Sequence, residues 1–294
     1  MTAGDPTVQP RLVIVDGVPM SALVAAAPDP RAVIVAIHGG GTTALYFDCP
    51  GHPELSLLRG GAKHGFTVVA IDRPGYGSSA AYPDAVAEPE QRVRLAYGVV
   101  DKVLGETPRG AGLFLMAHSG GCELAIRMAA EGSDEQRSGL IGMELAGTGR
   151  RYHPAAREIL KTATREHRPS GMRELLWYPT ELYPAEMLRG ATVYPGAPPY
   201  EDKMVSNWAR QDFPSLAPNV RIPVQFSTAE HEKVWECDAA AQAEIASMFT
   251  QAPRFEINEQ AGAGHNISVG HTAAAYHSTV FAFADQCVNA VGTH

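Results

Sequence analysis

The chain has 294 residues, of which 45% are hydrophobic and 19% are charged, so it can bury a core without disulfides or a structural metal. Its 24 lysines and arginines against 32 aspartates and glutamates give a formal net charge of −8, which argues against nucleic acid as the main partner. The apolar runs are far shorter than the roughly 20 residues that span a bilayer. Residues 1–10 lack the basic and apolar regions of a signal peptide. We therefore expect a cytoplasmic protein that binds neither membrane nor nucleic acid.

Short apolar runs alternate with helix-like stretches along most of the chain. The predicted strands are residues 11–15, 22–27, 32–37, 66–71, 112–117, 140–145, 222–226 and 254–257. The predicted helices are residues 90–104, 122–130, 239–249 and 272–288. Several strands, such as 32–37, are continuous apolar runs, as expected for strands buried on both faces. The alternation predicts an α/β fold with a mostly parallel sheet and helices on both of its faces.

Residues 149–219 interrupt this alternation. The segment is rich in proline, arginine and glutamate and contains the bulky aromatic residues Trp177, Tyr178, Tyr183, Tyr194 and Trp208. So many aromatic side chains favour an ordered lid with helical pieces over a disordered loop. We expect a body formed by residues 1–148 and 220–294, with residues 149–219 inserted as the lid.

The four cysteines, Cys49, Cys122, Cys237 and Cys287, are scattered and form no C-x-x-C pair. They are expected to be reduced thiols, and nothing in their spacing indicates a metal site or a redox motif. No metal or cofactor is predicted.

Ser119 lies in Ala-His-Ser-Gly-Gly, residues 117–121, between a predicted strand and a predicted helix. A sharp strand-to-helix turn needs small residues beside its apex because the backbone passes close to itself. The serine would then project at the carboxyl edge of the sheet, above the free N–H groups of a helix N-terminus. Ser119 is a candidate nucleophile, and the amide of Gly120 a candidate donor to an oxyanion. The alternative is a tight turn with an incidental serine, and Ala117 replaces the first glycine of G-x-S-x-G.

The run His38-Gly39-Gly40-Gly41 directly follows the strand at residues 32–37. Consecutive glycines let backbone N–H groups approach a ligand closely, as a second oxyanion donor must. We choose Gly40 as this donor, although the sequence does not separate it from Gly41.

A serine nucleophile needs a base. His265 lies among small residues in the loop at 261–266, after the last predicted strand, where it can approach Ser119. His118 is too close to the serine in sequence to face it, and His38 is expected to support the glycine loop. The remaining near misses are His231, His271 and His277.

The base in turn needs an orienting acid, expected in the loop at residues 227–235 after the seventh predicted strand. Glu232 lies deeper in this loop and ranks first, followed by Glu230. Glu144 ranks third, because a charge on a buried strand is costly unless it is paired.

A further motif is Asp-Arg-Pro-Gly-Tyr-Gly-Ser-Ser at residues 72–79, which follows the fourth predicted strand. The chain resembles the α/β-hydrolase fold superfamily, and in particular its serine esterases and thioesterases with a cap insertion. The order Ser119, Glu232, His265, the His-Gly-Gly-Gly run and the loop at 72–79 all match that superfamily. Ala117 in place of glycine and Glu232 in place of aspartate are departures. The resemblance implies an eight-stranded, mostly parallel sheet and a helical lid inserted after strand 6.

The resemblance also implies acyl transfer through an acyl-enzyme on Ser119, with His265 as base, Glu232 as orienting acid and the amides of Gly40 and Gly120 as the oxyanion hole. The expected substrate is a small ester or thioester with hydrophobic parts. A serine argues against epoxide hydrolases and haloalkane dehalogenases, which use aspartate there. The same residues could instead serve a cyclase or acyltransferase of secondary metabolism or a C–C bond hydrolase, and the fold could also serve a non-catalytic receptor for small molecules.

Overall fold

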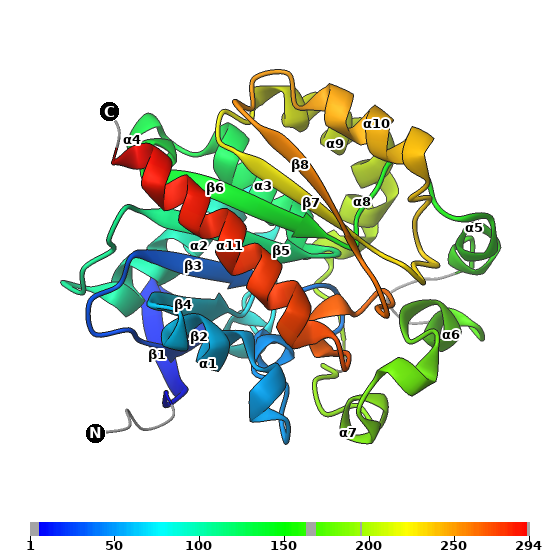
Figure 1. The fold of residues 1–294 in the computed structure, drawn as a ribbon, viewed down its shortest axis with the longest axis horizontal. Coiled ribbons are helices and arrows are strands. Elements are labelled where there is room, and N and C mark those ends of the chain that lie inside the picture. Colours follow the sequence, from blue (N-terminus) through cyan, green and yellow to red (C-terminus); the bar gives the residue numbers. More distant parts are fainter. Residues whose placement is uncertain (1–5, 163–168, 195, 293–294) are drawn as a thin grey trace.

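The computed structural model describes residues 6–162, 169–194 and 196–292. They contain one eight-stranded sheet with strand order β1-β2-β4-β3-β5-β6-β7-β8 (Figure 1). The strands are β1 Gln9–Val15, β2 Val18–Ala25, β3 Ala32–Ile37, β4 Phe66–Ile71, β5 Leu113–His118, β6 Leu140–Ala146, β7 Val224–Ala229 and β8 Phe255–Gln260. β2 pairs antiparallel with both of its neighbours, and the strands from β4 to β8 in this order are all parallel. The predicted fold class is confirmed.

Helices cover both faces of the sheet. The α-helices are α1 Leu57–Lys63, α2 Pro89–Leu104, α3 Gly121–Glu131, α4 Asp134–Ser138, α5 Pro154–Leu160, α6 Met172–Leu176, α7 Ala185–Leu188, α8 Tyr200–Asn207, α9 Phe213–Leu216, α10 Ala239–Met248 and α11 Ala273–Val291. Apolar side chains of α1 and α11 form one core with the sheet, and those of α2, α3 and α10 form a second core on its other face. Figure 1 shows α11 crossing the near face, with α2 and α3 behind the sheet.

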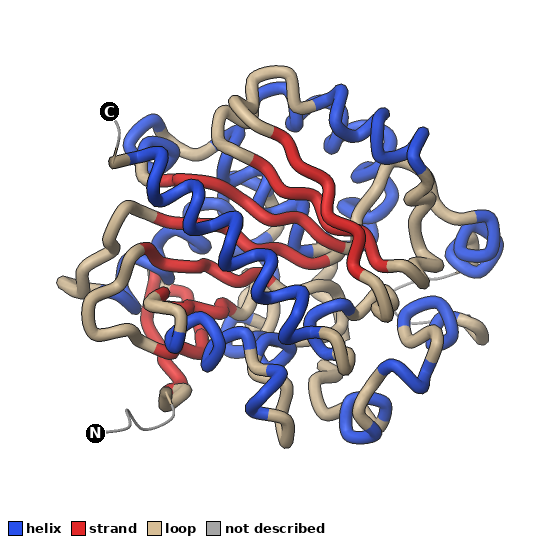
Figure 2. The backbone as a smooth tube through the Cα atoms, viewed as in Figure 1, coloured by secondary structure: helices blue, strands red, loops and turns tan. Residues whose placement is uncertain are grey.

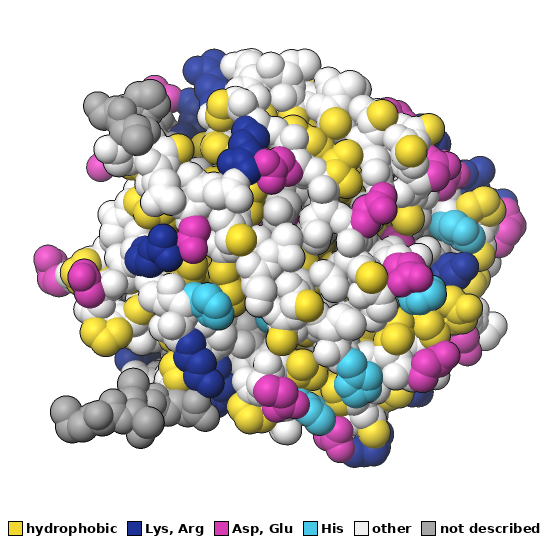
Figure 3. Space-filling model, in the orientation of Figure 1, with side chains coloured by type: hydrophobic (Ala, Val, Ile, Leu, Met, Phe, Trp, Pro, Cys, Tyr) yellow, Lys and Arg dark blue, Asp and Glu magenta, His cyan; other side chains and the backbone are white. Residues whose placement is uncertain are grey.

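The central strands supply both cores because successive side chains of a strand point to opposite faces. On β3, Val33, Val35 and Ile37 join the core of α2 and α3, whereas Ile34 and Ala36 join the core of α1 and α11. This is why their sequence is continuously apolar. On the surface above α11, acidic and basic side chains are interspersed (Figure 3).

The segment between β6 and β7 contains α5 to α9 and a π-helical stretch, Trp208–Asp212, that joins α8 to α9. Its contacts of strand type within the described residues are the isolated bridges Thr42↔Val193 and Tyr152↔Trp235. In the drawings α5, α6 and α7 lie beyond the carboxyl ends of the strands, whereas α9 packs against α3 on one face of the sheet (Figure 1 and Figure 2). The helical insertion after the sixth strand is thus confirmed, while its division from the body at residues 149 and 219 stays a prediction.

All eight predicted strands are present, with ends that differ by a few residues. β7 begins at Val224 and continues to Ala229, through the small and polar residues 227–229 that resemble a loop in sequence. Helices α1 and α4 were not predicted. α1 contains Gly60 and Gly61, which weaken the helical pattern in the sequence. Glycine is nevertheless needed at position 61, because a Cβ there would lie 2.3 Å from the Val68 side chain. Among the described helices, none is long and apolar enough to traverse a bilayer.

Candidate active site

Ser119 occupies the turn between β5 and α3. Its φ of +51° is a left-handed backbone conformation that residues with a Cβ rarely adopt. The turn is held by a hydrogen bond from the Ser119 N–H to the Ala146 carbonyl, 2.8 Å. A Cβ on Gly121 would lie 2.4 Å from the Ile37 carbonyl oxygen, so only glycine fits there. The close approach of β3 therefore explains why small residues are needed beside Ser119, as predicted.

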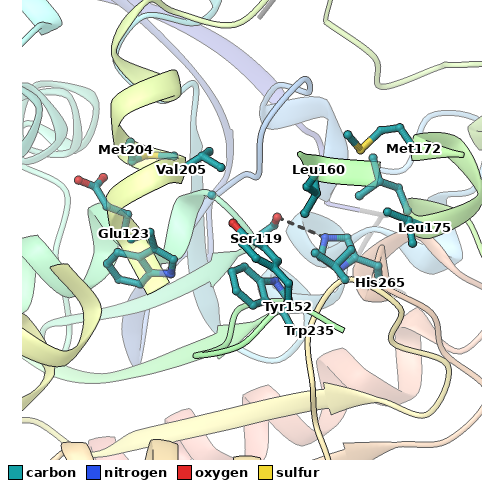
Figure 4. A pocket seen from close by; sticks show the side chains of 14 residues that line it. Ser119, Glu123, Tyr152, Leu160, Met172, Leu175, Met204, Val205, Trp235 and His265 are labelled. Atoms are coloured by element: carbon teal, nitrogen blue, oxygen red, sulfur yellow. Dashed lines mark hydrogen bonds between the residues drawn. The ribbon is translucent and has the colours of Figure 1, made fainter. Parts of the chain in front are cut away.

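His265 connects Ser119 to Glu232. The Nε2 atom of His265 lies 3.2 Å from the Ser119 hydroxyl oxygen (Figure 4), and its Nδ1 lies 2.9 Å and 3.0 Å from the two carboxylate oxygens of Glu232. A carboxylate only accepts hydrogen bonds, so Nδ1 carries the hydrogen and Nε2 is free to accept from the serine. The three side chains come from the loops after β5, β7 and β8, which meet at the carboxyl edge of the sheet.

Glu232 is held as a carboxylate inside the protein. Burial raises its pKa, but the charge and hydrogen bond of His265 and the backbone N–H of Val234 together outweigh burial and leave the pKa below its ordinary value. The Val234 N–H donates to Oε1 at 2.7 Å. Glu232 is thus ionised at neutral pH and cannot rotate away from the imidazole without losing this bond.

The second candidate acid, Glu230, lies elsewhere. Its side chain is 54% exposed, and its Oε2 accepts a hydrogen bond from the Gly262 N–H at 2.7 Å. Successive residues of this loop point in different directions, so Glu230 steadies the turn that leads to His265 without touching the imidazole.

The third candidate, Glu144, is fully buried on β6 and accepts a hydrogen bond from the Tyr276 hydroxyl at 2.9 Å. Burial raises the pKa of this carboxyl to about 8. Glu144 faces the core beneath α11, away from the imidazole of His265, so it is a buried core acid.

Glu144 makes stability depend on pH. Its folded pKa of about 8 lies above the ordinary 4.5, so between these values the folded protein binds one proton more than the unfolded chain, and stability falls as pH rises. Below about pH 6.5 the buried neutral histidines act in the opposite direction, so we expect the melting temperature of the wild type to drop between pH 7 and pH 8, and Glu144→Gln to flatten that slope. Thermal unfolding followed by circular dichroism tests this. Equal slopes for both proteins would show that the carboxyl does not titrate in this window.

The structure separates the two candidate oxyanion donors. The Gly41 N–H donates to the Tyr76 hydroxyl at 3.1 Å. The amide nitrogen of Gly40 instead lies 3.5 Å from where a Cβ on Gly120 would be, which brings the Gly40 and Gly120 loops together above Ser119. Within the described residues, neither the Gly40 N–H nor the Gly120 N–H has a protein acceptor. This geometry favours Gly40 over Gly41.

Two further histidines support these loops. His38 donates from Nδ1 to the Gly39 carbonyl at 2.7 Å and accepts from the Arg73 N–H at 3.0 Å, in line with the predicted supporting role. His118 donates from Nε2 to the backbone carbonyl of His265 at 2.8 Å and stacks on Tyr46 with ring centroids 4.8 Å apart. Burial lowers the pKa of His118 to about 3, so it stays neutral.

The three near misses of the sequence analysis lie away from Ser119. His231 is beside Glu230, His271 follows the His265 loop, and His277 is buried on α11, where burial lowers its pKa to about 3. Sequence reasoning missed Arg73, which is 1% exposed and lies under the glycine loop. A signal was present, since Arg73 is the second residue after β4, within the conspicuous loop at 72–79.

Two cavities meet at Ser119 and His265. One is a pocket of about 150 Å³, lined mostly by apolar side chains that include Leu160, Met172, Leu175, Met204, Trp208 and Trp235 (Figure 4). The other is a wider, more polar cleft of about 1020 Å³ along the glycine loop and the insertion. A substrate at Ser119 could therefore place a compact apolar group on one side and a larger group on the other.

The model of the alpha/beta hydrolase family matches residues 34–277, and the chain belongs to that family. No curated protein matches the sequence. Among solved structures, a soluble variant of the monoglyceride lipase of Saccharomyces cerevisiae is 16% identical, with a TM-score of 0.67, over 99% of this chain and 96% of the lipase.

Two further solved structures are similar. A putative aryl esterase from Burkholderia cenocepacia is 13% identical, with a TM-score of 0.69, over 96% of this chain and 100% of the esterase. The thioesterase domain from the curacin biosynthetic pathway is 17% identical, with a TM-score of 0.60, over 94% of this chain and 99% of the domain. At these identities the likeness concerns the fold.

Proposed function

We propose that the protein is a serine hydrolase that cleaves an ester or thioester through an acyl-enzyme on Ser119. The observation that carries this proposal is the unbroken line of hydrogen bonds from Ser119 through His265 to Glu232. The line ends next to an apolar pocket and to the Gly40 and Gly120 N–H groups, which have no protein acceptor among the described residues.

In the proposed reaction, His265 Nε2 takes the hydroxyl proton as Ser119 attacks the substrate carbonyl carbon. The carbonyl oxygen becomes an oxyanion that accepts from the Gly40 and Gly120 N–H groups. His265 returns the proton to the departing alcohol or thiol, and the carbon–oxygen or carbon–sulfur bond breaks. Water then attacks the acyl-enzyme by the same steps, giving a carboxylic acid and free Ser119. Glu232 stabilises the imidazolium formed in each half.

The proposal is tested with a fluorophosphonate probe, which forms a covalent bond only with an activated serine. We expect stoichiometric labelling of the wild type at Ser119, identified by peptide mass spectrometry, and none of Ser119→Ala. A well-folded wild type that resists the probe would exclude this mechanism and favour a binding role for the fold.

The apolar pocket suggests a compact acyl group. A cavity of about 150 Å³ lined mostly by apolar side chains holds a molecule the size of benzene, or about six carbons. The wider cleft suits the leaving group, because it offers the departing molecule more room and a more polar surface. We therefore propose medium-length or single-ring acyl esters or thioesters as substrates.

Among p-nitrophenyl esters, kcat/KM is expected to peak near hexanoate. Each methylene buried up to that length contributes about 0.8 kcal/mol, or roughly fourfold, and longer chains exceed the pocket. Leu175→Ala, which enlarges the pocket, should move the optimum to longer chains. Ile245→Ala, an equally buried change on α10 outside the pocket, should leave it in place. Rates that rise steadily to dodecanoate would contradict this pocket assignment.

A further inference from the structure

We infer that Arg73, held by Glu201 of the insertion, is a positioning residue that orients the Gly40 N–H of the oxyanion hole. This inference rests on the proposed function. Arg73 is 1% exposed, and its guanidinium lies between the glycine loop after β3, the turn after β5 and helix α8.

The guanidinium of Arg73 binds both loops that carry the oxyanion donors. Nη2 donates to the Gly39 carbonyl at 3.1 Å, and Nη1 lies 3.4 Å from the Gly120 carbonyl. Nη2 also forms a close hydrogen-bonded ion pair with Glu201, whose side chain is 10% exposed. Arg73 therefore touches the two donor loops and the insertion at once.

The Gly39 carbonyl and the Gly40 N–H belong to the same peptide group. In a trans peptide these two bonds point in opposite directions, so fixing the oxygen fixes the direction of the N–H. The Gly39 oxygen accepts from two sides, from Arg73 and from His38 Nδ1. A loop of three glycines has no side chains to hold its conformation, and these two bonds supply the missing constraint.

Glu201 makes the buried charge tolerable and brings the insertion into the site. An unpaired guanidinium inside the protein would be costly, and Glu201 compensates it. The other carboxylate oxygen of Glu201 lies 3.5 Å from where a Cβ on Gly40 would be. Without Arg73, Glu201 would leave an uncompensated negative charge beside the developing oxyanion. Removing Arg73 alone should thus lower kcat more than removing both charges does.

The test measures kcat and KM on p-nitrophenyl hexanoate for Arg73→Met, Arg73→Lys and Arg73→Met/Glu201→Gln. Rates are normalised to the sites that a fluorophosphonate titrates. We expect Arg73→Met to lower kcat about 50-fold with KM changed less than about threefold, since a whole oxyanion donor is worth 10²–10³. Arg73→Lys should recover part of the loss. The kcat of the double variant should be about fivefold higher than that of Arg73→Met, because the unpaired carboxylate is gone.

A transition-state analogue separates positioning from a structural role. An alkyl boronic acid forms a tetrahedral adduct whose oxygen occupies the oxyanion hole, so its Ki should rise in proportion to the fall in kcat/KM across the variants. Arg92→Met is the matched control. Arg92 is 4% exposed, donates to two backbone carbonyls, pairs with Glu123 and stacks on Tyr200, but it contacts neither donor loop nor Glu201. It should cost stability and leave kcat per titrated site within threefold.

An Arg73→Met protein whose kcat per titrated site stays within threefold of the wild type would overturn the inference. So would a double variant no faster than Arg73→Met. If Arg73→Met does not fold, Glu201→Ala, which frees the guanidinium without emptying its site, should lower kcat about tenfold. A wild type that no fluorophosphonate labels would instead refute the proposed function, and the inference with it.

Discussion

Ser119→Ala should lower kcat by about a million-fold while leaving the fold intact, as removal of the nucleophile does in hydrolases of this mechanism. The alanine keeps the Cβ and the φ of +51°, so the turn between β5 and α3 is not disturbed. Turnover of p-nitrophenyl hexanoate, measured with protein free of contaminating esterase, gives the comparison. Residual activity above one part in a thousand would mean that another group performs the attack.

A second substitution at this position isolates the backbone strain. Ser119→Gly also removes the hydroxyl, but glycine adopts positive φ without penalty, so it should be about 1 kcal/mol more stable than Ser119→Ala. Urea unfolding of the two inactive proteins measures the difference. Equal stability would indicate that the left-handed conformation at this position carries no measurable cost for a residue with a Cβ.

Glu232→Gln should lower kcat by about 10⁴, the loss that the corresponding amide substitution causes in a serine–histidine–acid triad. An amide offers an N–H as readily as an oxygen, so it no longer selects the tautomer that leaves Nε2 free to accept from Ser119. It also removes the negative charge that stabilises the imidazolium. Rates on a p-nitrophenyl ester, together with fluorophosphonate labelling rates, measure the effect.

Glu230→Gln is the matched control for this substitution, since it changes the same side chain two residues away. Its oxygen can still accept from the Gly262 N–H, so kcat should stay within a few-fold of the wild type. If Glu230→Gln were the damaging change and Glu232→Gln the mild one, the assignment of the acid would be wrong.

Most of the fold was predictable because its central strands are buried on both faces. A run such as Ala32–Ile37 admits almost only apolar residues, which makes it visible in sequence. The order of the strands then places the residues after β5, β7 and β8 at one edge. Ser119, Glu232 and His265 could be chosen on that ground.

The finer choices depend on side-chain directions that a sequence does not contain. Glu230 and Glu232 differ in whether the loop turns them toward His265, and Gly40 and Gly41 differ in whether Tyr76 already accepts from their N–H. The contact between Arg73 and Glu201 joins residues 128 positions apart. It depends on the path of the insertion, whose short helices leave little periodic signal.

The adjacency of β3 and β5 in the sheet sets the dimensions of the proposed oxyanion hole. Ile37 and Ala117 are paired across these strands, and Gly40 and Gly120 each follow three residues later. The starting points of the two donor loops are therefore separated by the spacing of parallel strands, about 4.8 Å, which backbone hydrogen bonds maintain. The sheet, and not the side chains of the pocket, determines this spacing. Substitutions that reshape the pocket or the cleft can change which molecule enters, while the distance between the two N–H groups that we propose receive the oxyanion stays constant.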